Sequence, residues 1–204
     1  MKTSINNIFI TILMLIMANV GFTQRKNRMV QDVDGNKYQT VRIGNLDWMS
    51  ENLRTTHFSS GESILESFVS KYDNNIYYSW ITTTKDVCPL GWRIPSNDDW
   101  DAMENQFGGE DVAGVSLKSD NEDSWGMFAL MASNSSGFSA QPSGYVNELG
   151  KLNNKGKFAY WWSSNDKDSE TAWGREIGFN QKQVYKGYAS KKDGLSIRCV
   201  KDVK

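Results

Sequence analysis

The sequence has only one histidine, His57, two cysteines, Cys88 and Cys199, and three prolines. These counts exclude zinc-finger spacings and histidine-rich metal sites, because such sites need several Cys or His ligands close together. Charge of one sign is also lacking: 23 Lys and Arg residues oppose 24 Asp and Glu residues, with a net charge of −1 and no long run of either sign. We therefore expect no nucleic-acid partner and no electrostatic capture by an anionic membrane.

Apolar and aromatic side chains, by contrast, are plentiful. The 204 residues are 39% hydrophobic and include 9 Phe, 8 Tyr and 8 Trp, which is enough large apolar surface to fill a core. This composition argues against intrinsic disorder. No internal repeat and no Pro/Ser-rich linker divides the chain, so its length predicts one domain.

The N-terminus is typical of a targeting segment. Lys2 precedes an eleven-residue apolar run at 8–18, which is shorter than the roughly 20 residues that a spanning helix needs. We therefore expect a signal peptide over 1–24, then a short linker over 25–31 and a single domain over 32–202. Export to the periplasm, the outer surface or the medium follows, with no transmembrane span after cleavage; a retained N-terminal anchor is the alternative. No cysteine follows the apolar run closely, so the chain is not expected to be a lipoprotein.

Export also bears on the two cysteines. In an oxidising compartment, two cysteines and no third favour a single bridge, Cys88–Cys199. Such a bond would tie the middle of the chain to its last strand, with a stabilisation of about 4–5 kcal/mol in the chain-entropy model. The alternative is two free buried thiols. A catalytic cysteine is disfavoured, because no second histidine exists beside His57.

The start of the domain predicts a turn and a hairpin. Asp34-Gly35-Asn36 has turn chemistry. The alternating run 38–43 and the run 46–49 flank Gly44-Asn45, which predicts a β-hairpin with its turn at these two residues. Residues 58–75 contain a short apolar cluster at helical spacing and are expected to form a weak helix or an ordered loop.

The clearest helix signal covers residues 96–107. Ser96 is a credible N-cap, and Asp98 and Asp99 lie in the first turn, where the helix dipole favours negative charge. Trp100 and Met103 fall on one face, and Gly108 supplies a C-terminal stop. The remaining strand candidates are 76–80, 158–163, 172–177, 183–185 and 195–200. In the last of them, the period of two places Leu195, Ile197 and Cys199 on one face.

Five segments together resemble a known family. They are DVDGNKY at 32–38, WMSENL at 48–53, CPLGWRIPS at 88–96 running on to Trp100, the stretch 156–164 with YWWSS, and GLSIRCVKD at 194–202. Their order and spacing are similar to the Fibrobacter succinogenes major paralogous domain, a family of exported bacterial proteins, and the likeness covers nearly all of 32–202.

Two of these stretches also resemble the formylglycine-generating-enzyme family, at Arg93–Trp100 and Gly194–Arg198. That resemblance implies an α+β fold, namely a C-type-lectin-like roll with mixed twisted sheets, few helices and long irregular loops. It does not carry over the catalysis, because formylglycine-generating chemistry needs a reactive cysteine pair that binds copper, and Cys88 and Cys199 are better used as a bridge. His57 lacks a nucleophile-elbow pattern that would make it part of a triad. We expect no catalytic residue, no cofactor and no enzyme activity.

The resemblance to C-type lectins leaves open whether the protein has a calcium site. C-type lectins bind it through loop carboxylates and amides beside a proline, and Gln141-Pro142-Ser143 followed by Asn165 and Asp166 is faintly similar in order. Ser143 stands where lectins use an acid or amide, which argues against direct sugar coordination. Asn165 and Asp166 are thus only weak Ca²⁺ candidates, and ordinary turns explain them equally well.

The tryptophans divide into framework and surface candidates. Trp92, Trp100 and Trp162 lie in the framework motifs and are expected in the core, whereas Trp125 lies in a polar stretch and is a candidate contact residue. With Asn165 and Asp166 it forms the predicted ligand contacts. The preferred hypothesis is a secreted or cell-surface, non-catalytic module that binds a carbohydrate or a protein partner. The alternatives are an enzyme with an unrecognised active site and a structural cell-envelope component without a small ligand.

Overall fold

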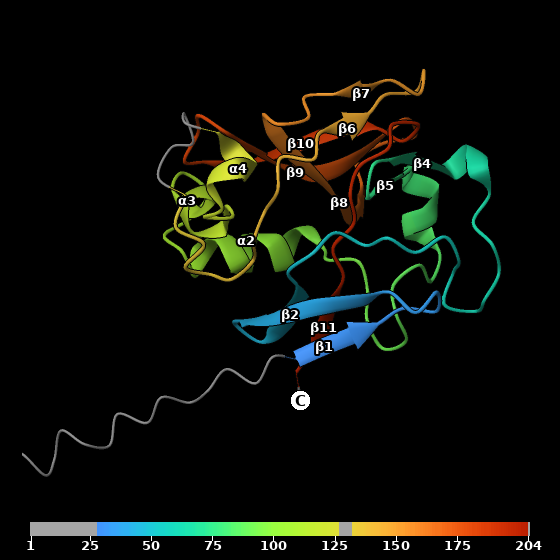
Figure 1. Ribbon diagram of the computed structural model, residues 1–204, viewed down its shortest axis with the longest axis horizontal. Coiled ribbons are helices and arrows are strands. Elements are labelled where there is room, and N and C mark those ends of the chain that lie inside the picture. Colours follow the sequence, from blue (N-terminus) through green and yellow to red (C-terminus); the bar gives the residue numbers. More distant parts are fainter. Residues whose placement is uncertain (1–27, 127–131, 204) are drawn as a thin grey trace, which may run out of the picture.

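A computed structural model describes residues 28–126 and 132–203. One sheet has four strands in the order β1-β2-β3-β11, and each neighbouring pair is antiparallel. Its members are β1 (Arg28–Gln31), β2 (Lys37–Ile43), β3 (Leu46–Met49) and β11 (Val200–Asp202). The described part of the chain therefore begins and ends in the same sheet, at one end of the molecule (Figure 1).

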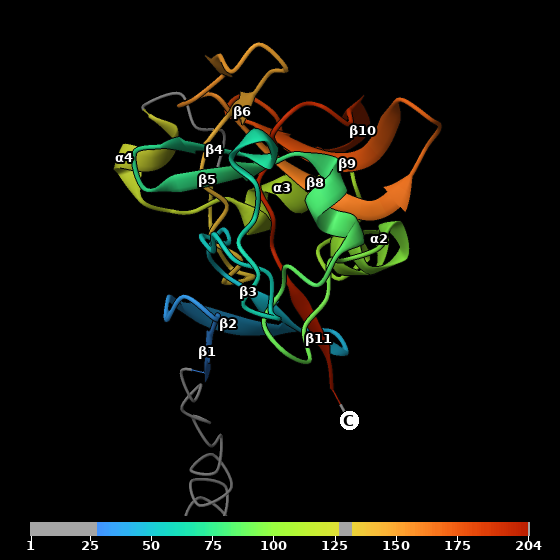
Figure 2. The same cartoon turned by 90° about the vertical axis from the view of Figure 1, so that its right-hand side faces the viewer.

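A second, three-stranded antiparallel sheet lies at the opposite end, as Figure 2 shows from another side. Its order is β10-β9-β8, formed by β8 (Phe158–Asp166), β9 (Thr171–Gly178) and β10 (Val184–Ser190). Two hairpins flank the body of the fold: β4 (Val69–Tyr72) with β5 (Asn75–Tyr78), and β6 (Tyr145–Val146) with β7 (Leu152–Asn153). The described fold is thus mostly β.

Helices are few and short. They are α2 (Asn97–Asn105), α3 (Ala113–Leu117) and α4 (Glu122–Trp125), with the 3₁₀ turns η2 (Glu66–Phe68) and η3 (Trp80–Thr84). The predicted start of α2 is confirmed: the Asp99 N–H donates to Ser96 Oγ at 3.2 Å, and the Ser96 N–H donates back to the Asp99 carboxylate at 2.7 Å. This reciprocal pair is a capping box. None of the helices in residues 28–126 and 132–203 combines the length and the apolar character needed to cross a bilayer.

The core of the described residues contains two hydrophobic clusters. One holds both cysteines with Trp162 and Leu195, and the other is aromatic, with Trp48 and Trp100 at a centroid distance of 5.0 Å. Trp161 and Phe138 complete the aromatic cluster, and all four rings are fully buried. The expected burial of Trp100 and Trp162 is confirmed, and Trp92 is partly buried against the first cluster.

The predicted disulfide is confirmed. Cys88 and Cys199 are bonded, with a Cα–Cα distance of 5.9 Å. The bond joins the segment before α2 to the segment that enters β11, and Arg93 forms a bridge to Val200 beside it. Two parts of the chain separated by 111 positions are thereby held together at the centre of the first hydrophobic cluster.

Several local predictions hold and others need correction. The hairpin at Gly44-Asn45 is formed by β2 and β3, and the strands predicted at 76–80, 158–163, 172–177 and 183–185 contribute to β5, β8, β9 and β10. The linker expected over 25–31 is wrong for Arg28–Gln31, which forms β1 and pairs with β2. Residues 25–27 and the expected signal peptide over 1–24 lie outside the described residues.

Two further segments differ from expectation. Within 58–75, η2 is followed by strand β4 instead of a longer helix, because Val69–Tyr72 pairs with β5. In the segment predicted as a strand over 195–200, only Val200 belongs to β11. Leu195 bridges to Tyr78 and Ser196 bridges to Trp161, so this segment lies between other elements and both of its faces are buried.

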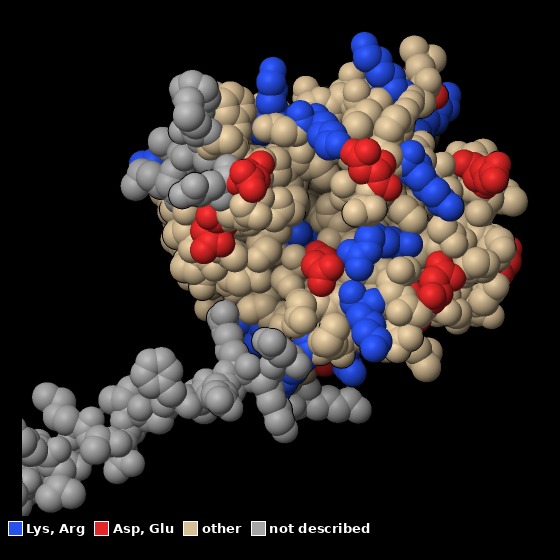
Figure 3. All heavy atoms as spheres, viewed as in Figure 1, with Lys and Arg blue, Asp and Glu red and all other residues tan. Residues whose placement is uncertain are grey.

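The surface carries mixed charge. In the view of Figure 3, Lys and Arg side chains alternate with Asp and Glu side chains over the visible face, without a large region of one sign. This agrees with the net charge of −1. The face seen in this view therefore offers a ligand no broad surface of a single charge.

Candidate ligand-binding groove

One face of the three-stranded sheet carries a row of polar and aromatic side chains. In the strand register, Glu176 of β9 lies opposite both Tyr160 of β8 and Tyr185 of β10. Residues directly opposite each other on neighbouring strands project their side chains to the same face. The sheet thus places one tyrosine on each side of the Glu176 carboxylate.

Beside this row, β9 and β10 carry only glycine and alanine, whereas β8 places Trp162 opposite Gly174. Gly174 of β9 pairs with Gly187 of β10, and Ala172 pairs with Ala189 one pleat further on. The small residues leave a hollow of about 410 Å³ on this face, which is lined by Tyr145, Tyr160, Gly174, Glu176, Tyr185, Asp193 and Leu195 among others. This groove, bounded by the Tyr160–Glu176–Tyr185 row, is the candidate site.

The walls of the groove are held by contacts between neighbouring elements. Tyr145 of β6 packs edge-on against Tyr160, with ring centroids 5.1 Å apart. Asn154 Nδ2 donates a hydrogen bond of 2.8 Å to the Tyr160 hydroxyl. Tyr185 is half-exposed at the open side. The groove therefore combines one braced tyrosine with one that is accessible from solvent.

Two carboxylates give the groove its electrostatic character. Burial raises the pKa of Glu176 above its ordinary value. Burial also raises the pKa of Asp193, and the Glu148 N–H, which donates to this carboxylate at 3.0 Å, opposes the rise. The pKa of Tyr160 is raised to about 12, chiefly by burial. The groove thus places two carboxyl groups and tyrosine hydroxyl donors side by side.

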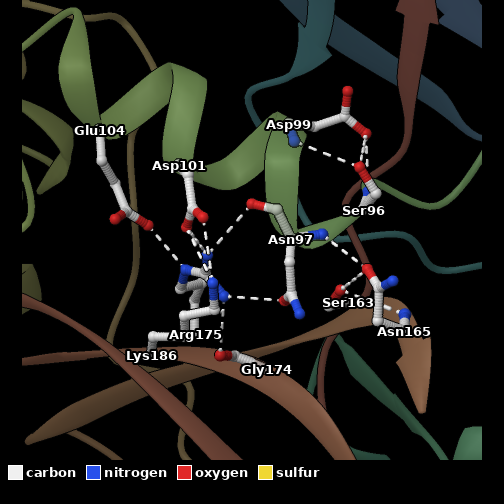
Figure 4. A network of polar contacts seen from close by, with 10 residues as sticks. All are labelled: Ser96, Asn97, Asp99, Asp101, Glu104, Ser163, Asn165, Gly174, Arg175 and Lys186. Atoms are coloured by element: carbon white, nitrogen blue, oxygen red, sulfur yellow. Dashed lines mark hydrogen bonds and ion pairs between the residues drawn. The ribbon is translucent and has the colours of Figure 1, made fainter. Parts of the chain in front are cut away.

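The opposite face of the same sheet is fixed to α2. Arg175 follows Gly174 in β9 and so points away from the groove. Its fully buried guanidinium donates from Nε to Glu104 at 2.6 Å and pairs with Asp101, while Nη1 donates to Asn97 Oδ1 at 3.1 Å (Figure 4). The buried ion pair anchors the helix behind the groove, so the groove lies on a rigid support.

Trp125, predicted as an exposed contact residue, is buried. Its side chain is only 2% exposed and its indole Nε1–H donates to the Ala140 carbonyl at 3.0 Å. The prediction of a surface contact at Trp125 is therefore wrong. The polar neighbours in sequence form the short helix α4, which turns the indole inward to the aromatic cluster.

Asn165 and Asp166 are exposed at the end of β8, but Asn165 already has a structural role. Its Oδ1 accepts the Asn97 N–H at 2.7 Å and the Ser163 hydroxyl at 3.1 Å (Figure 4). Asp166 lies 3.8 Å from Lys191 Nζ. The structure does not bring these two residues together with Trp125, which lies in the core.

The other members of the faint calcium pattern are also separated. Ser143 is buried and its hydroxyl lies 3.3 Å from that of Ser196. Within residues 28–126 and 132–203, no three or more His, Cys, Asp or Glu side chains form a group that could hold a metal ion.

His57 is part of a turn contact. Its Nδ1 lies 2.5 Å from the Asp34 carboxylate, which also accepts the Thr56 N–H. Hydrogen bonds from Thr56, His57 and Thr55 outweigh the opposing effect of burial and lower the pKa of Asp34. The histidine is partly exposed and is not among the residues that line the groove. The pair fastens the loop after β3 to the turn before β2.

The sequence predicted the strands of the groove but not the residues that line it. Tyr160, Glu176 and Tyr185 are far apart in the chain, and only the strand register makes them neighbours. A signal was nevertheless present at Gly174, which stands inside the strand predicted at 172–177, because glycine within a strand often marks a close approach to a ligand or to another backbone.

The described architecture defines a mostly β domain with two antiparallel sheets, few short helices and a ligand-sized hollow on one sheet. The chain belongs to the Fibrobacter succinogenes major domain family, whose model matches residues 41–201. The family resemblance carried by the five sequence segments is thereby confirmed. No curated protein and no solved structure matches the chain. The matched range contains every residue of the groove named above.

Proposed function

We propose that this protein is a secreted or cell-surface, non-catalytic module that binds a carbohydrate in the groove of the β8–β10 sheet. The observation that carries the proposal is the combination of Tyr160 and Tyr185 on either side of Glu176 over a floor of glycine and alanine. Tyrosine is suited to sugars, because its ring packs against the apolar face of a pyranose and its hydroxyl bonds the ring substituents.

The size and lining of the groove favour a small polar ligand. A volume of about 410 Å³ lies within the roughly 300–1,000 Å³ typical of small-molecule sites. Glu176 and Asp193 supply acceptors for sugar hydroxyls, and the Asn154 amide beside Tyr160 adds a polar group at the rim. A protein partner would require a larger apolar surface than this polar hollow offers.

The fold resemblance supports the same reading. The few helices and curled antiparallel sheets are compatible with a lectin-like roll related to formylglycine-generating enzymes, and we propose that architecture for the domain. The groove uses a sheet face rather than the loop positions Asn165 and Asp166, so the proposed binding requires no calcium. The apolar run at 8–18 and the Cys88–Cys199 bond support export.

The test is binding of the purified domain to a glycan array, followed by calorimetry with the best glycan. Tyr185→Ala should weaken binding at least about tenfold, because it removes the accessible stacking ring, whereas Tyr185→Phe should retain most of the affinity. Leu90→Ala serves as the surface control, because Leu90 is 93% exposed and lies outside the groove. Glycan binding that Tyr185→Ala leaves unchanged, or no binding to any glycan, would contradict the proposal.

A further inference from the structure

A second cavity lies apart from the groove and shares no lining residue with it. Its volume is about 860 Å³, and its walls come from the β2–β3 region, the turn between β4 and β5, and the segment around Ser139. Six of its lining residues carry side-chain amides: Asn36, Gln39, Asn52, Asn74, Asn75 and Gln141. The lining includes two cations, Arg54 and Arg198, against one acid, Glu51.

Arg198 is buried. Among the described residues, no carboxylate forms a hydrogen bond or an ion pair with its guanidinium. Its side chain is fully enclosed, and its guanidinium is held by oxygen atoms that carry no charge: Asn52 Oδ1 at 3.0 Å, Ser139 O at 3.0 Å, and the carbonyls of Met49 and Phe138. The Phe138 ring lies 4.1 Å from the guanidinium carbon. Arg54, by contrast, is already paired with Glu51 at 3.1 Å.

The bonds of Arg198 leave one donor over. A guanidinium has five N–H groups, and the contacts above use one on Nε, two on Nη1 and one on Nη2. The second Nη2 hydrogen has no acceptor in residues 28–126 and 132–203. Nη2 donates one hydrogen bond to the Ser139 carbonyl, and Nε donates to Asn52 Oδ1. Both Ser139 and Asn52 line the cavity. A buried charge with a free donor at a cavity wall favours an anionic ligand.

The amide side chains of the cavity indicate what chemical groups the anionic ligand carries. The side chains of Gln39, Asn74, Asn75 and Gln141 make no hydrogen bond within the described part of the chain, although all four line the cavity. An amide offers both a donor and an acceptor, which is the pattern that matches a hydroxyl group. A cation together with several free amides therefore suits a ligand that has one negative charge and many hydroxyls.

We propose that this second cavity binds a hexuronate, a sugar unit whose carboxylate accepts from Arg198 and whose hydroxyls bond the amides. The cavity is independent of the proposed function of the groove, since the two have no residue in common. Burial lowers the pKa of Arg198 only to about 9, so the guanidinium keeps its charge at neutral pH.

The experiment is calorimetry of the purified domain with D-glucuronate and D-galacturonate, beside glucose, galactose and sodium sulfate. One of the uronates should bind at least about tenfold more tightly than its neutral sugar, and its affinity should fall as salt is added. Replacing Arg198 itself endangers the fold, so the decisive variant is Gln141→Glu. Gln141 is exposed, and the nearly isosteric carboxylate should weaken uronate binding by about tenfold through repulsion.

The matched control is Gln106→Glu, which makes the same change in net charge at the end of α2, away from the lining of this cavity. It should leave uronate binding unchanged. Tyr185→Ala should also leave uronate binding unchanged, which separates this cavity from the groove. Uronates that bind no better than neutral sugars, or that ignore Gln141→Glu, would overturn the proposal. Sulfate that binds as tightly as a uronate would overturn the assignment to a sugar.

Discussion

Gly174 and Gly187 pair across the floor of the groove, but a methyl group would meet different neighbours at the two positions. A Cβ on Gly174 would lie 2.6 Å from the Trp161 carbonyl oxygen, which is backbone in the adjacent strand. A Cβ on Gly187 would lie 3.0 Å from the Tyr185 ring, which can turn aside. Alanine at Gly174 should therefore mainly reduce stability, whereas alanine at Gly187 should mainly weaken binding.

Gly174→Ala should lower the free energy of unfolding by about 1–3 kcal/mol, because the strand backbone cannot move away without breaking the sheet. Gly187→Ala should change it by less than about 1 kcal/mol but should weaken glycan binding, since the methyl group and the displaced Tyr185 ring fill the hollow. Urea unfolding and calorimetry on both variants check this. Equal destabilisation by the two would mean that the groove floor is not packed as described.

Glu176 provides a second test at the level of a single residue, through the pH dependence of stability. Because burial raises its pKa in the folded state, the wild-type protein loses stability as the pH rises from the ordinary glutamate pKa through the raised one. Glu176→Gln removes that loss. The variant should therefore be more stable than the wild type at pH 7, and the advantage should shrink as the pH falls toward the ordinary value of 4.5.

The measurement is urea unfolding of both proteins between pH 4 and pH 7. The exposed Glu170 supplies the control variant, Glu170→Gln, which makes the same chemical change outside the lining of the groove. The opposite result would be a variant whose stability relative to the wild type falls as the pH rises from 4 to 7. That result would show that a partner stabilises the charged Glu176 carboxylate.

At the scale of elements, α2 depends on residues that come from the sheet. Arg175 and Glu104 form an ion pair in which both side chains are almost completely buried. Arg175→Met should cost about 3–5 kcal/mol, because it leaves the Glu104 carboxylate buried without its partner. The double variant Arg175→Met with Glu104→Gln should recover much of that loss, as a double-mutant cycle by urea unfolding would measure. Additive losses would contradict a coupled pair.

The N-terminus of α2 is also capped from outside, by Asn165. Since its Oδ1 accepts the Asn97 N–H, Asn165→Ala should lower stability by about 1 kcal/mol, and addition of calcium or EDTA should make no difference. Asp166→Ala is the neighbouring control and should cost less than about 0.5 kcal/mol, since its contact with Lys191 is exposed. A loss that appears only in the presence of calcium would instead indicate a metal site at Asn165.

Across the whole molecule, the sequence predicted those features that depend on residues close together in the chain. Ser96 and Asp99 specify the start of α2, and Gly44-Asn45 specifies a hairpin, because the interacting groups are close together in the chain. The groove could not be derived in this way, since Glu176 meets Tyr160 and Tyr185 only through the register of three strands. Trp125 was misassigned for the same reason: polar neighbours in sequence do not reveal that α4 turns its indole toward the core.

The Cys88–Cys199 bond acts on the whole chain, because it closes a loop that spans 111 positions. Closing so long a loop removes much of the freedom of the unfolded chain, so Cys88→Ala with Cys199→Ala should lower the free energy of unfolding by about 4–5 kcal/mol. Urea unfolding of the oxidised protein, of the protein reduced with dithiothreitol and of the double variant measures this. The last two should agree within about 1 kcal/mol, since both lack the same constraint. If reduction left the stability unchanged, the packing of the first hydrophobic cluster alone would hold the segment before α2 against β11.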